Sequence, residues 1–245
     1  MKETEELEIR SSVKNRYSRL ATRTAKGDCW GGDSCCGDSD SGSMDAVPVE
    51  ASSVNAGCGS PLLLVTPKTG ETVLDLGSGG GIDVFRASQY VGAAGRVIGV
   101  DATPEMIWRA RSTREKYGDK YSNTEFRLGE IECLPIASES VNYVISNCVI
   151  NLSPDKQSVF DEAFRVLKKG GTFAVADVTL DRDIPENERR NMDSWSACVS
   201  GGLTDTAYRN ALEKAGFVDV SIERASSSDA GDSPYHSSHI MARKM

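Results

Sequence analysis

The sequence predicts an α/β fold with a doubly wound parallel sheet, and three observations support this prediction. Short β-branched apolar segments alternate with helical patterns over about 110 residues, as in successive strand–helix–strand units. The first of these segments opens directly into glycines. The chain has 245 residues and is 39% hydrophobic, which is enough for one large domain with its own core.

Two segments precede the alternating part. Residues 2–25 carry apolar side chains at loosely helical spacing, which predicts a helix that docks on a larger body. Residues 27–55 are rich in Gly, Ser and Asp and contain three cysteines, so we expect a loop or linker there. We therefore expect an N-terminal helix and Cys-rich loop over residues 1–54 and the main domain over residues 55–245.

The main domain then alternates between strands and helices. Strands are expected within residues 71–79, 95–101, 124–130, 141–148 and 171–178. Helices are expected within residues 82–92, 104–118 and 155–171. Thr103 is the expected cap of the second helix and Pro104 lies in its first turn. The polar segment at about 181–203 follows the last of these strands and is predicted to form a lid.

Composition excludes several classes of partner. The net charge is −8, and Lys and Arg are scattered without a basic stripe, so a nucleic-acid partner is not expected. The first ten residues are too charged for a signal peptide, and no apolar run reaches the roughly 18–20 residues of a membrane span. We therefore expect a cytoplasmic protein without a membrane partner. Cytoplasmic thiols stay reduced, so the seven cysteines are expected to be ligands or redox groups.

The glycine-rich stretch "DLGSGGG" at residues 75–81 connects the first strand to a helix. Because glycine has no Cβ, this backbone can approach a ligand closely at the carboxyl edge of the sheet. The second strand ends in Asp101, whose carboxylate can accept hydrogen bonds from a ribose diol. Ile82 stands where the G-x-G-x-x-G dinucleotide fingerprint needs glycine, which argues against a nicotinamide oxidoreductase. A tight strand–helix connection without a ligand is the plain structural alternative.

The strings "VLDLGSGGGID" and "VIGVDATPEMIWRAR" resemble the S-adenosylmethionine-binding half of class I methyltransferases. A longer resemblance, over most of residues 56–203, is to arsenite methyltransferases. It includes "AGCGSP", "SNCVINLSPDK" and "SACVSGGL", whose cysteines generic methyltransferases lack at these places. The resemblance implies a Rossmann-like class I methyltransferase sheet with an N-terminal helix and a Cys-rich loop.

The resemblance also implies an activity and a set of site residues. The implied enzyme transfers methyl groups from S-adenosyl-L-methionine to trivalent arsenic, as arsenite or methylarsenite, in arsenic detoxification. The implied cofactor-binding residues are Asp75, Gly77, Ser78, Gly79, Asp101, Ala102, Ile131, Glu132 and Asn147. Among them, Asp101 is expected to bind the ribose, and Ile131 and Glu132 to lie near the adenine.

The implied catalytic residues and arsenic ligands are Cys58, Cys148 and Cys198. They come from three separated segments that can meet at the carboxyl edge of the sheet. Soft thiolates select thiophilic centres over Mg²⁺ or Ca²⁺, and trivalent arsenic favours three sulfurs. For each cysteine alone, the plain alternative is a small buried hydrophobic residue. That structural role is the one we assign to Cys133.

Cys35 and Cys36 are candidates for a thiol relay that takes arsenic from a carrier thiol or exchanges with the reductant. Zinc is the rival ligand, but the spacing is not C-x-x-C and the two histidines lie near the C-terminus. The expected partners are thiol conjugates of trivalent arsenic and the thioredoxin or glutathione system. A C-methyltransferase of quinone-type molecules would share the cofactor half without needing three cysteines. A sequestering protein would need the cysteines without the glycine loop.

Overall fold

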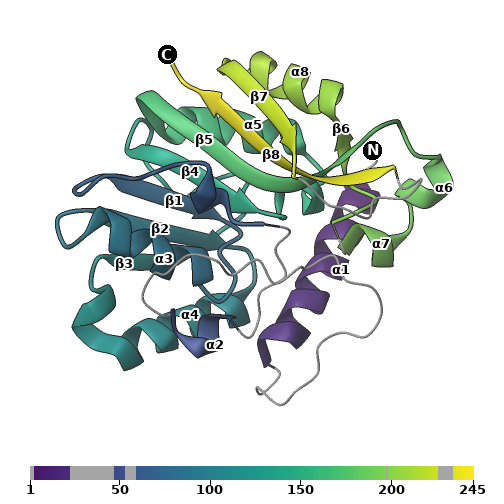
Figure 1. Cartoon of the computed structure of the whole chain (residues 1–245). Coiled ribbons are helices and arrows are strands. Elements are labelled where there is room, and N and C mark those ends of the chain that lie inside the picture. The colour runs from purple at the N-terminus through teal and green to yellow at the C-terminus, as the bar shows by residue number, and fades with distance from the viewer. Residues whose placement is uncertain (1–2, 23–46, 53–58, 197, 226–233) are drawn as a thin grey trace.

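The computed structural model describes residues 3–22, 47–52, 59–196, 198–225 and 234–245. These residues form an eight-stranded sheet with helices on both faces (Figure 1). The strands are β1 (Thr72–Leu76), β2 (Arg96–Asp101), β3 (Thr124–Leu128), β4 (Val141–Asn147), β5 (Leu167–Leu180), β6 (Leu203–Thr204), β7 (Val218–Arg224) and β8 (Tyr235–Arg243). The α-helices are α1 (Glu3–Thr22), α2 (Val49–Ser52), α3 (Ile82–Val91), α4 (Pro104–Tyr117), α5 (Lys156–Val166), α6 (Glu186–Arg189), α7 (Met192–Ser196) and α8 (Asp205–Ala215). Short 3₁₀ helices are η1 (Pro61–Leu63), η2 (Gly118–Tyr121) and η3 (Ile150–Leu152).

The strand order is β3-β2-β1-β4-β5-β8-β7, with β6 paired to β5. Strands β1 to β6 pair in parallel, and β8 runs antiparallel to both β5 and β7. The predicted fold class is therefore confirmed, although the antiparallel pair at the end of the chain was not predicted. The chain builds outward from β1 in one direction and then returns to add β4 on the other side. Such a reversal of strand order leaves a crevice at the carboxyl ends of β1 and β4.

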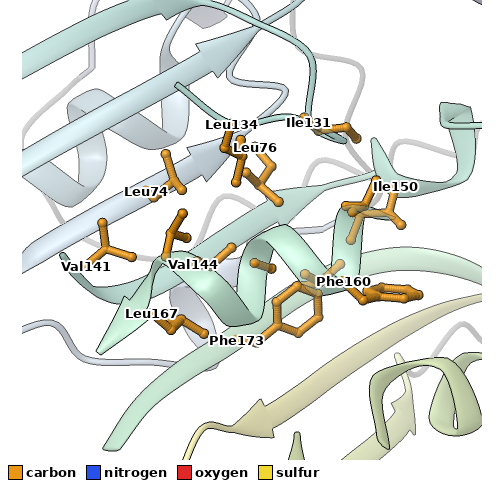
Figure 2. Close-up of a cluster of buried hydrophobic side chains, with 14 of the residues drawn as sticks. Leu74, Leu76, Ile131, Leu134, Val141, Val144, Ile150, Phe160, Leu167 and Phe173 are labelled. Carbon is orange, nitrogen blue, oxygen red and sulfur yellow. The ribbon is translucent and has the colours of Figure 1, made fainter. Parts of the chain in front are cut away.

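Alternating side chains of the strands build a core on each face of the sheet. Leu74 and Leu76 belong to the core beneath α5 and α8, whereas Val73, the residue before Leu74, belongs to the core beneath α3 and α4. Figure 2 shows the first of these clusters, in which Phe160 of α5 and Phe173 of β5 lie near each other. Burying each such side chain stabilises the fold by about 1.5–3 kcal/mol.

Helix α5 ends earlier than the sequence predicts. The predicted helix extended to residue 171, but Leu167 is already extended, with φ −65° and ψ 138°, and pairs with Val141. The two glycines that suggested a helix end instead lie inside β5, where Gly170 N–H donates to Lys244 O at 2.7 Å. Thr103 does occupy the N-cap position of α4, but its side chain makes no capping hydrogen bond.

Helix α1 packs beside α4 and α7, which agrees with the predicted docking of the N-terminal segment (Figure 1). Arg109 of α4 anchors the C-terminal end of α1, because its Nη1 donates to Ala21 O at 3.0 Å. The segment predicted as a polar lid contains α6 and α7. It is not polar throughout, because Trp195 and Cys198 are both buried. None of the helices that the structure describes has the length and apolar character needed to traverse a membrane.

Candidate active site

A pocket lies at the carboxyl ends of β1, β2 and β4, where the strand order reverses. Its walls come from the glycine loop 77–80, residues 101–103 after β2, residues 130–132 after β3, residues 147–149 after β4, and one face of α1. The pocket encloses about 1040 Å³, including open solvent at its mouth. That volume suits a ligand of nucleoside-cofactor size.

The structure brings all nine residues assigned to the cofactor around this pocket, together with Cys148. The glycine loop reaches its shape through left-handed backbone at Gly77 (φ 67°) and Gly79 (φ 50°). A Cβ on Gly77 would lie 2.4 Å from Val149, so any larger residue would clash there. A Cβ on Gly79 would meet only Met106, at 4.0 Å, so this glycine faces the open pocket.

Asp101 both faces the pocket and shapes its wall. Its Oδ2 accepts a hydrogen bond from Gly79 N–H at 2.9 Å, and its Oδ1 accepts one from Thr103 N–H at 2.8 Å. The carboxylate therefore ties the glycine loop to the segment that begins α4. Each carboxylate oxygen can accept a further bond, so the predicted ribose contact is compatible with this arrangement.

Replacing Asp101 with alanine is expected to weaken S-adenosylmethionine binding by about 1–3 kcal/mol. The variant loses the acceptor for the ribose and releases the glycine loop. Isothermal titration calorimetry measures the change, with Asp101→Asn as the comparison because it keeps one acceptor oxygen and should lose less. An Asp101→Ala variant with the affinity of the parent would show that the ribose lies elsewhere.

Buried carboxylates make the pocket suited to a cation. Burial raises the pKa of Asp75 well above its usual value, and the neighbouring charges of Asp83 and Asp101 raise it further. Burial also raises the pKa values of Asp83 and Asp101 themselves. A ligand with positive charges, such as a sulfonium and an ammonium group, would stabilise the ionised carboxylates. The hydroxyl of Ser78 is buried against Gly99 of β2 and has no hydrogen-bond partner within the described residues.

The two residues predicted near the adenine have different surroundings. Ile131 is buried and lines the pocket. The carboxylate of Glu132 pairs with Arg10 at 3.0 Å and accepts a hydrogen bond from Ser153 Oγ at 2.6 Å. The Glu132 side chain is therefore held by protein groups on two sides. Asn147 also lines the pocket and donates from Nδ2 to Gly59 O at 2.6 Å and to Asp83 Oδ2 at 3.3 Å.

Cys148 and Cys198 meet directly. The Sγ of Cys198 donates to the backbone O of Cys148 at 2.7 Å, and both residues pack with Leu152. Asn151 Nδ2 also donates to Cys198 O at 3.2 Å. Both cysteines have left-handed backbone, with φ 59° at Cys148 and φ 65° at Cys198. Such backbone is strained for a residue with a side chain and is concentrated at functional sites.

The cysteines among the described residues differ in oxidation state. Cys148 takes part in a disulfide bond, whereas Cys133 and Cys198 are free. Burial raises the pKa of the Cys198 thiol, so it is protonated at neutral pH in the absence of a ligand. The structural role assigned to Cys133 is wrong, because its side chain is exposed and is not part of the core. The remaining predicted site cysteines, Cys58, Cys35 and Cys36, lie outside the described residues.

Sequence reasoning missed the contribution of α1 to this pocket. Arg10, Val13, Lys14 and Tyr17 all line it. Lys14 Nζ pairs with a carboxylate oxygen of Glu130 at 2.6 Å, on the side where the adenine is expected. The spacing of these four residues, three and four apart, places them on one helical face. This spacing was visible in the sequence, but two cations on an apolar face do not by themselves point to a cofactor.

A second buried polar group lies behind the cysteines. Asp177 of β5 is fully buried, its Oδ1 accepts from Val178 N–H at 2.9 Å, and its Oδ2 has no hydrogen-bond partner in the described part of the chain. Burial raises the pKa of Asp177 from 3.8 to about 7. Burial also lowers the pKa of Lys156 from 10.5 to about 8, and the Lys156 Nζ lies 5.1 Å from the centroid of the Trp195 ring.

The raised pKa of Asp177 predicts how the free energy of unfolding depends on pH. The folded state holds the Asp177 proton more tightly than the unfolded chain does, so this stabilisation is present below pH 3.8 and is lost as the pH rises to about 7. Asp177→Asn stays neutral and lacks this dependence. We expect the unfolding free energy of the parent, relative to that of the variant, to fall between pH 5 and pH 8 by on the order of 2–3 kcal/mol.

Urea unfolding of both proteins at the two pH values measures this difference. Asp75, Asp83 and Asp101 impose the same direction of dependence on both proteins, so the comparison reports on Asp177 together with Lys156, whose pKa the Asp177 charge raises. The same relative stability at pH 5 and pH 8 would show that Asp177 is ionised throughout.

Comparison with known proteins gives consistent matches. Residues 67–216 match the Methyltransferase domain family. The arsenite methyltransferase of Halobacterium salinarum is 45% identical over 233 residues, which are 88% of this chain and 59% of that protein. The human arsenite methyltransferase is 42% identical over 170 residues, which are 66% of this chain and 44% of that protein. The chain thus spans 59% and 44% of the lengths of these two relatives.

A solved structure also resembles the chain. The arsenic(III) S-adenosylmethionine methyltransferase of Chlamydomonas reinhardtii superposes with a TM-score of 0.71 and 37% sequence identity. The match covers 81% of this chain and 71% of that structure.

Proposed function

Because the chain belongs to the arsenite methyltransferase family, within the methyltransferase-domain proteins, we propose that it methylates trivalent arsenic. The methyl donor is S-adenosyl-L-methionine, the acceptors are arsenite and methylarsenite, and the role is arsenic detoxification. The observation that supports this most is the contact between Cys148 and Cys198 at the pocket, with 2.7 Å between the Cys198 Sγ and the Cys148 O. Two sulfur-bearing residues beside a cation-binding pocket suit a thiophilic acceptor.

The residues of the pocket fit the methyl donor. S-adenosylmethionine supplies a methyl group on a positively charged sulfur. Asp75 and Asp83 stabilise the positive charges of this ligand, and Asp101 binds the ribose. Gly79 leaves room for the ligand because it presents no side chain to the pocket.

The cysteines hold the acceptor. Arsenic arrives as a thiol conjugate and is transferred to Cys58, Cys148 and Cys198 by successive exchange. At each cysteine one arsenic–sulfur bond to the carrier breaks, one to the protein forms, and the cysteine proton leaves on the carrier thiol. Three thiolates leave the arsenic lone pair unshared, and that lone pair attacks the methyl carbon. No general base is required, because the lone pair carries no proton.

Positioning supplies much of the rate. A well-oriented acceptor and donor at near-attack distance lower the barrier by about 7–11 kcal/mol relative to free reactants. The left-handed backbone at Cys148 and Cys198 contributes to this positioning, because it sets the direction in which each Cα–Cβ bond leaves the chain.

Electrons are needed after transfer, since methylation formally oxidises arsenic by two electrons. Two protein thiols supply these electrons by closing a disulfide, and thioredoxin or glutathione reopens it. The disulfide at Cys148 must likewise be reduced before this residue can bind arsenic. Cys35 and Cys36 serve as the relay between the carrier or reductant and the site.

The decisive experiment is incubation of the protein with S-adenosylmethionine, a thiol reductant and arsenite, followed by separation of the arsenic species. We expect methylated arsenic that depends on both the methyl donor and the reductant. A parallel incubation with a quinone-type acceptor tests the C-methyltransferase alternative. Calorimetric binding of S-adenosylmethionine without any methylated arsenic would overturn the proposed acceptor while leaving the cofactor assignment intact.

A further inference from the structure

We propose that Tyr17 of α1 is a positioning residue of the acceptor site and that its phenol holds the sulfur of Cys198 while arsenic is bound. The inference rests on the proposed function, because it assigns a role toward the same acceptor. Tyr17 lies in the N-terminal segment, outside the strands and glycine loop that carry the methyltransferase fold. It therefore adds a residue from a different part of the chain to the site.

The contacts of Tyr17 support this role. Its ring packs, together with Val13, against the cluster of Cys148, Leu152 and Cys198. This packing brings its phenol beside the Cys198 side chain, and each of the two groups influences the pKa of the other. Tyr17 also lines the pocket that contains the glycine loop. One side chain thus touches a predicted arsenic ligand and faces the cofactor pocket.

The hydrogen bonds run in one direction. The Tyr17 O–H lies beside a sulfur that is left to accept, because the Cys198 S–H already donates to Cys148 O at 2.7 Å. When arsenic replaces the proton on Cys198, the hydrogen bond from Cys198 to Cys148 O is lost, because its hydrogen leaves with the carrier thiol. The bond from Tyr17 can remain, because the arsenic-bound sulfur keeps a lone pair that accepts the phenol hydrogen. Tyr17 is thus the side chain that still restrains Cys198 once arsenic is bound.

Burial keeps Tyr17 in the form that can donate. It raises the pKa of the phenol well above its usual value, and the nearby Cys198 raises it further. The hydroxyl therefore keeps its proton at neutral pH. The groups that face it are Cys198, Arg16 and Asp101, and neither of the two charged groups removes the proton.

Helix α1 is itself fixed at several points. Lys14 and Arg10 pair with Glu130 at 2.6 and 3.3 Å, respectively, on the segment expected to border the adenine. At the other end, Arg109 Nη1 donates to Ala21 O at 3.0 Å. Tyr17 lies between these anchors. The position of its hydroxyl is therefore set by contacts on both sides rather than by its own rotamer alone.

The test compares Tyr17→Phe, which removes only the hydroxyl, with Tyr143→Phe as a matched control. Tyr143 lies in β4 at the opposite end of the strand from Cys148, and burial together with the neighbouring Glu71 raises the pKa of its phenol. The measurements are arsenite affinity by quenching of tryptophan fluorescence, S-adenosylmethionine affinity by calorimetry, the melting temperature, and kcat and KM for arsenite methylation.

For Tyr17→Phe we expect arsenite affinity and kcat to fall roughly two- to tenfold, the effect of one hydrogen bond. The affinity for S-adenosylmethionine should be unchanged, since the ring still closes the pocket. Tyr143→Phe should match the parent in both affinities and in kcat. A merely structural role would instead lower the melting temperature and both affinities together.

Two results overturn the inference. If Tyr17→Phe has the arsenite affinity and kcat of the parent, the hydroxyl does not hold Cys198, although the proposed function stands. If the parent protein binds S-adenosylmethionine but neither binds nor methylates arsenite, the proposed function fails and the role of Tyr17 fails with it.

Discussion

Replacing Cys148 with serine is expected to abolish the methylation of inorganic arsenite, with a loss of at least roughly a hundredfold. Serine has nearly the same size, but its hydroxyl is a hard, weakly acidic ligand that trivalent arsenic does not favour. The side chain is 2% exposed, so the substitution changes the chemistry of the site more than its packing. Methylation is measured by arsenic speciation, and calorimetric S-adenosylmethionine binding confirms that the variant is folded.

The matched control is Cys133→Ser, which removes an exposed free thiol and should keep the parent rate. Cys198→Ser should behave like Cys148→Ser on both arsenite and methylarsenite. Cys58→Ser should retain activity toward methylarsenite, whose carbon fills one of the three arsenic positions. A Cys148→Ser variant that methylates arsenite at the parent rate would show that this sulfur serves only in packing.

Replacing Gly79 with valine is expected to eliminate S-adenosylmethionine binding and therefore all methyl transfer. A Cβ at this position meets nothing closer than Met106 at 4.0 Å, so the new side chain would enter the space that the ligand needs. The protein should remain folded, apart from the strain of a β-branched residue at φ 50°. Calorimetry with S-adenosylmethionine and thermal unfolding measure the two effects separately.

Gly118→Val provides the control for strain. Gly118 has a similar φ of 54°, and nothing lies within 4 Å of the Cβ that it lacks. It lies at the end of α4, away from the residues that line the pocket. Both variants should therefore lose comparable stability, but only Gly79→Val should lose binding. Equal affinity in the two variants would exclude the glycine loop as the cofactor site.

The sequence predicted the parallel part of the fold because its signals are local. Each strand from β1 to β5 is a short apolar segment with a glycine or polar residue beyond it, and the periodicity of each segment depends only on near neighbours. The end of α5 was mispredicted because Gly170 resembles a helix cap. Whether it caps a helix or turns within a strand depends on pairing with Lys244, which is distant in the sequence.

The pocket was predictable in part for the same reason. Asp101 and Asn147 end their strands, and strand ends meet at one edge whatever the loops do. The contribution of α1 was not predictable, because its position depends on docking contacts such as that of Lys14 with Glu130. The exposure of Cys133 was missed because an apolar neighbourhood in sequence does not fix which way a loop side chain points.

The left-handed backbone at Cys148 and Cys198 has an evolutionary consequence. The fold itself gives no preference for cysteine there, because glycine and asparagine adopt such a conformation more readily. If the arsenic chemistry were no longer under selection, drift would carry both positions toward those residues at little loss of stability. The residue found at these two positions would therefore distinguish homologues that still methylate arsenic from those that keep only the scaffold.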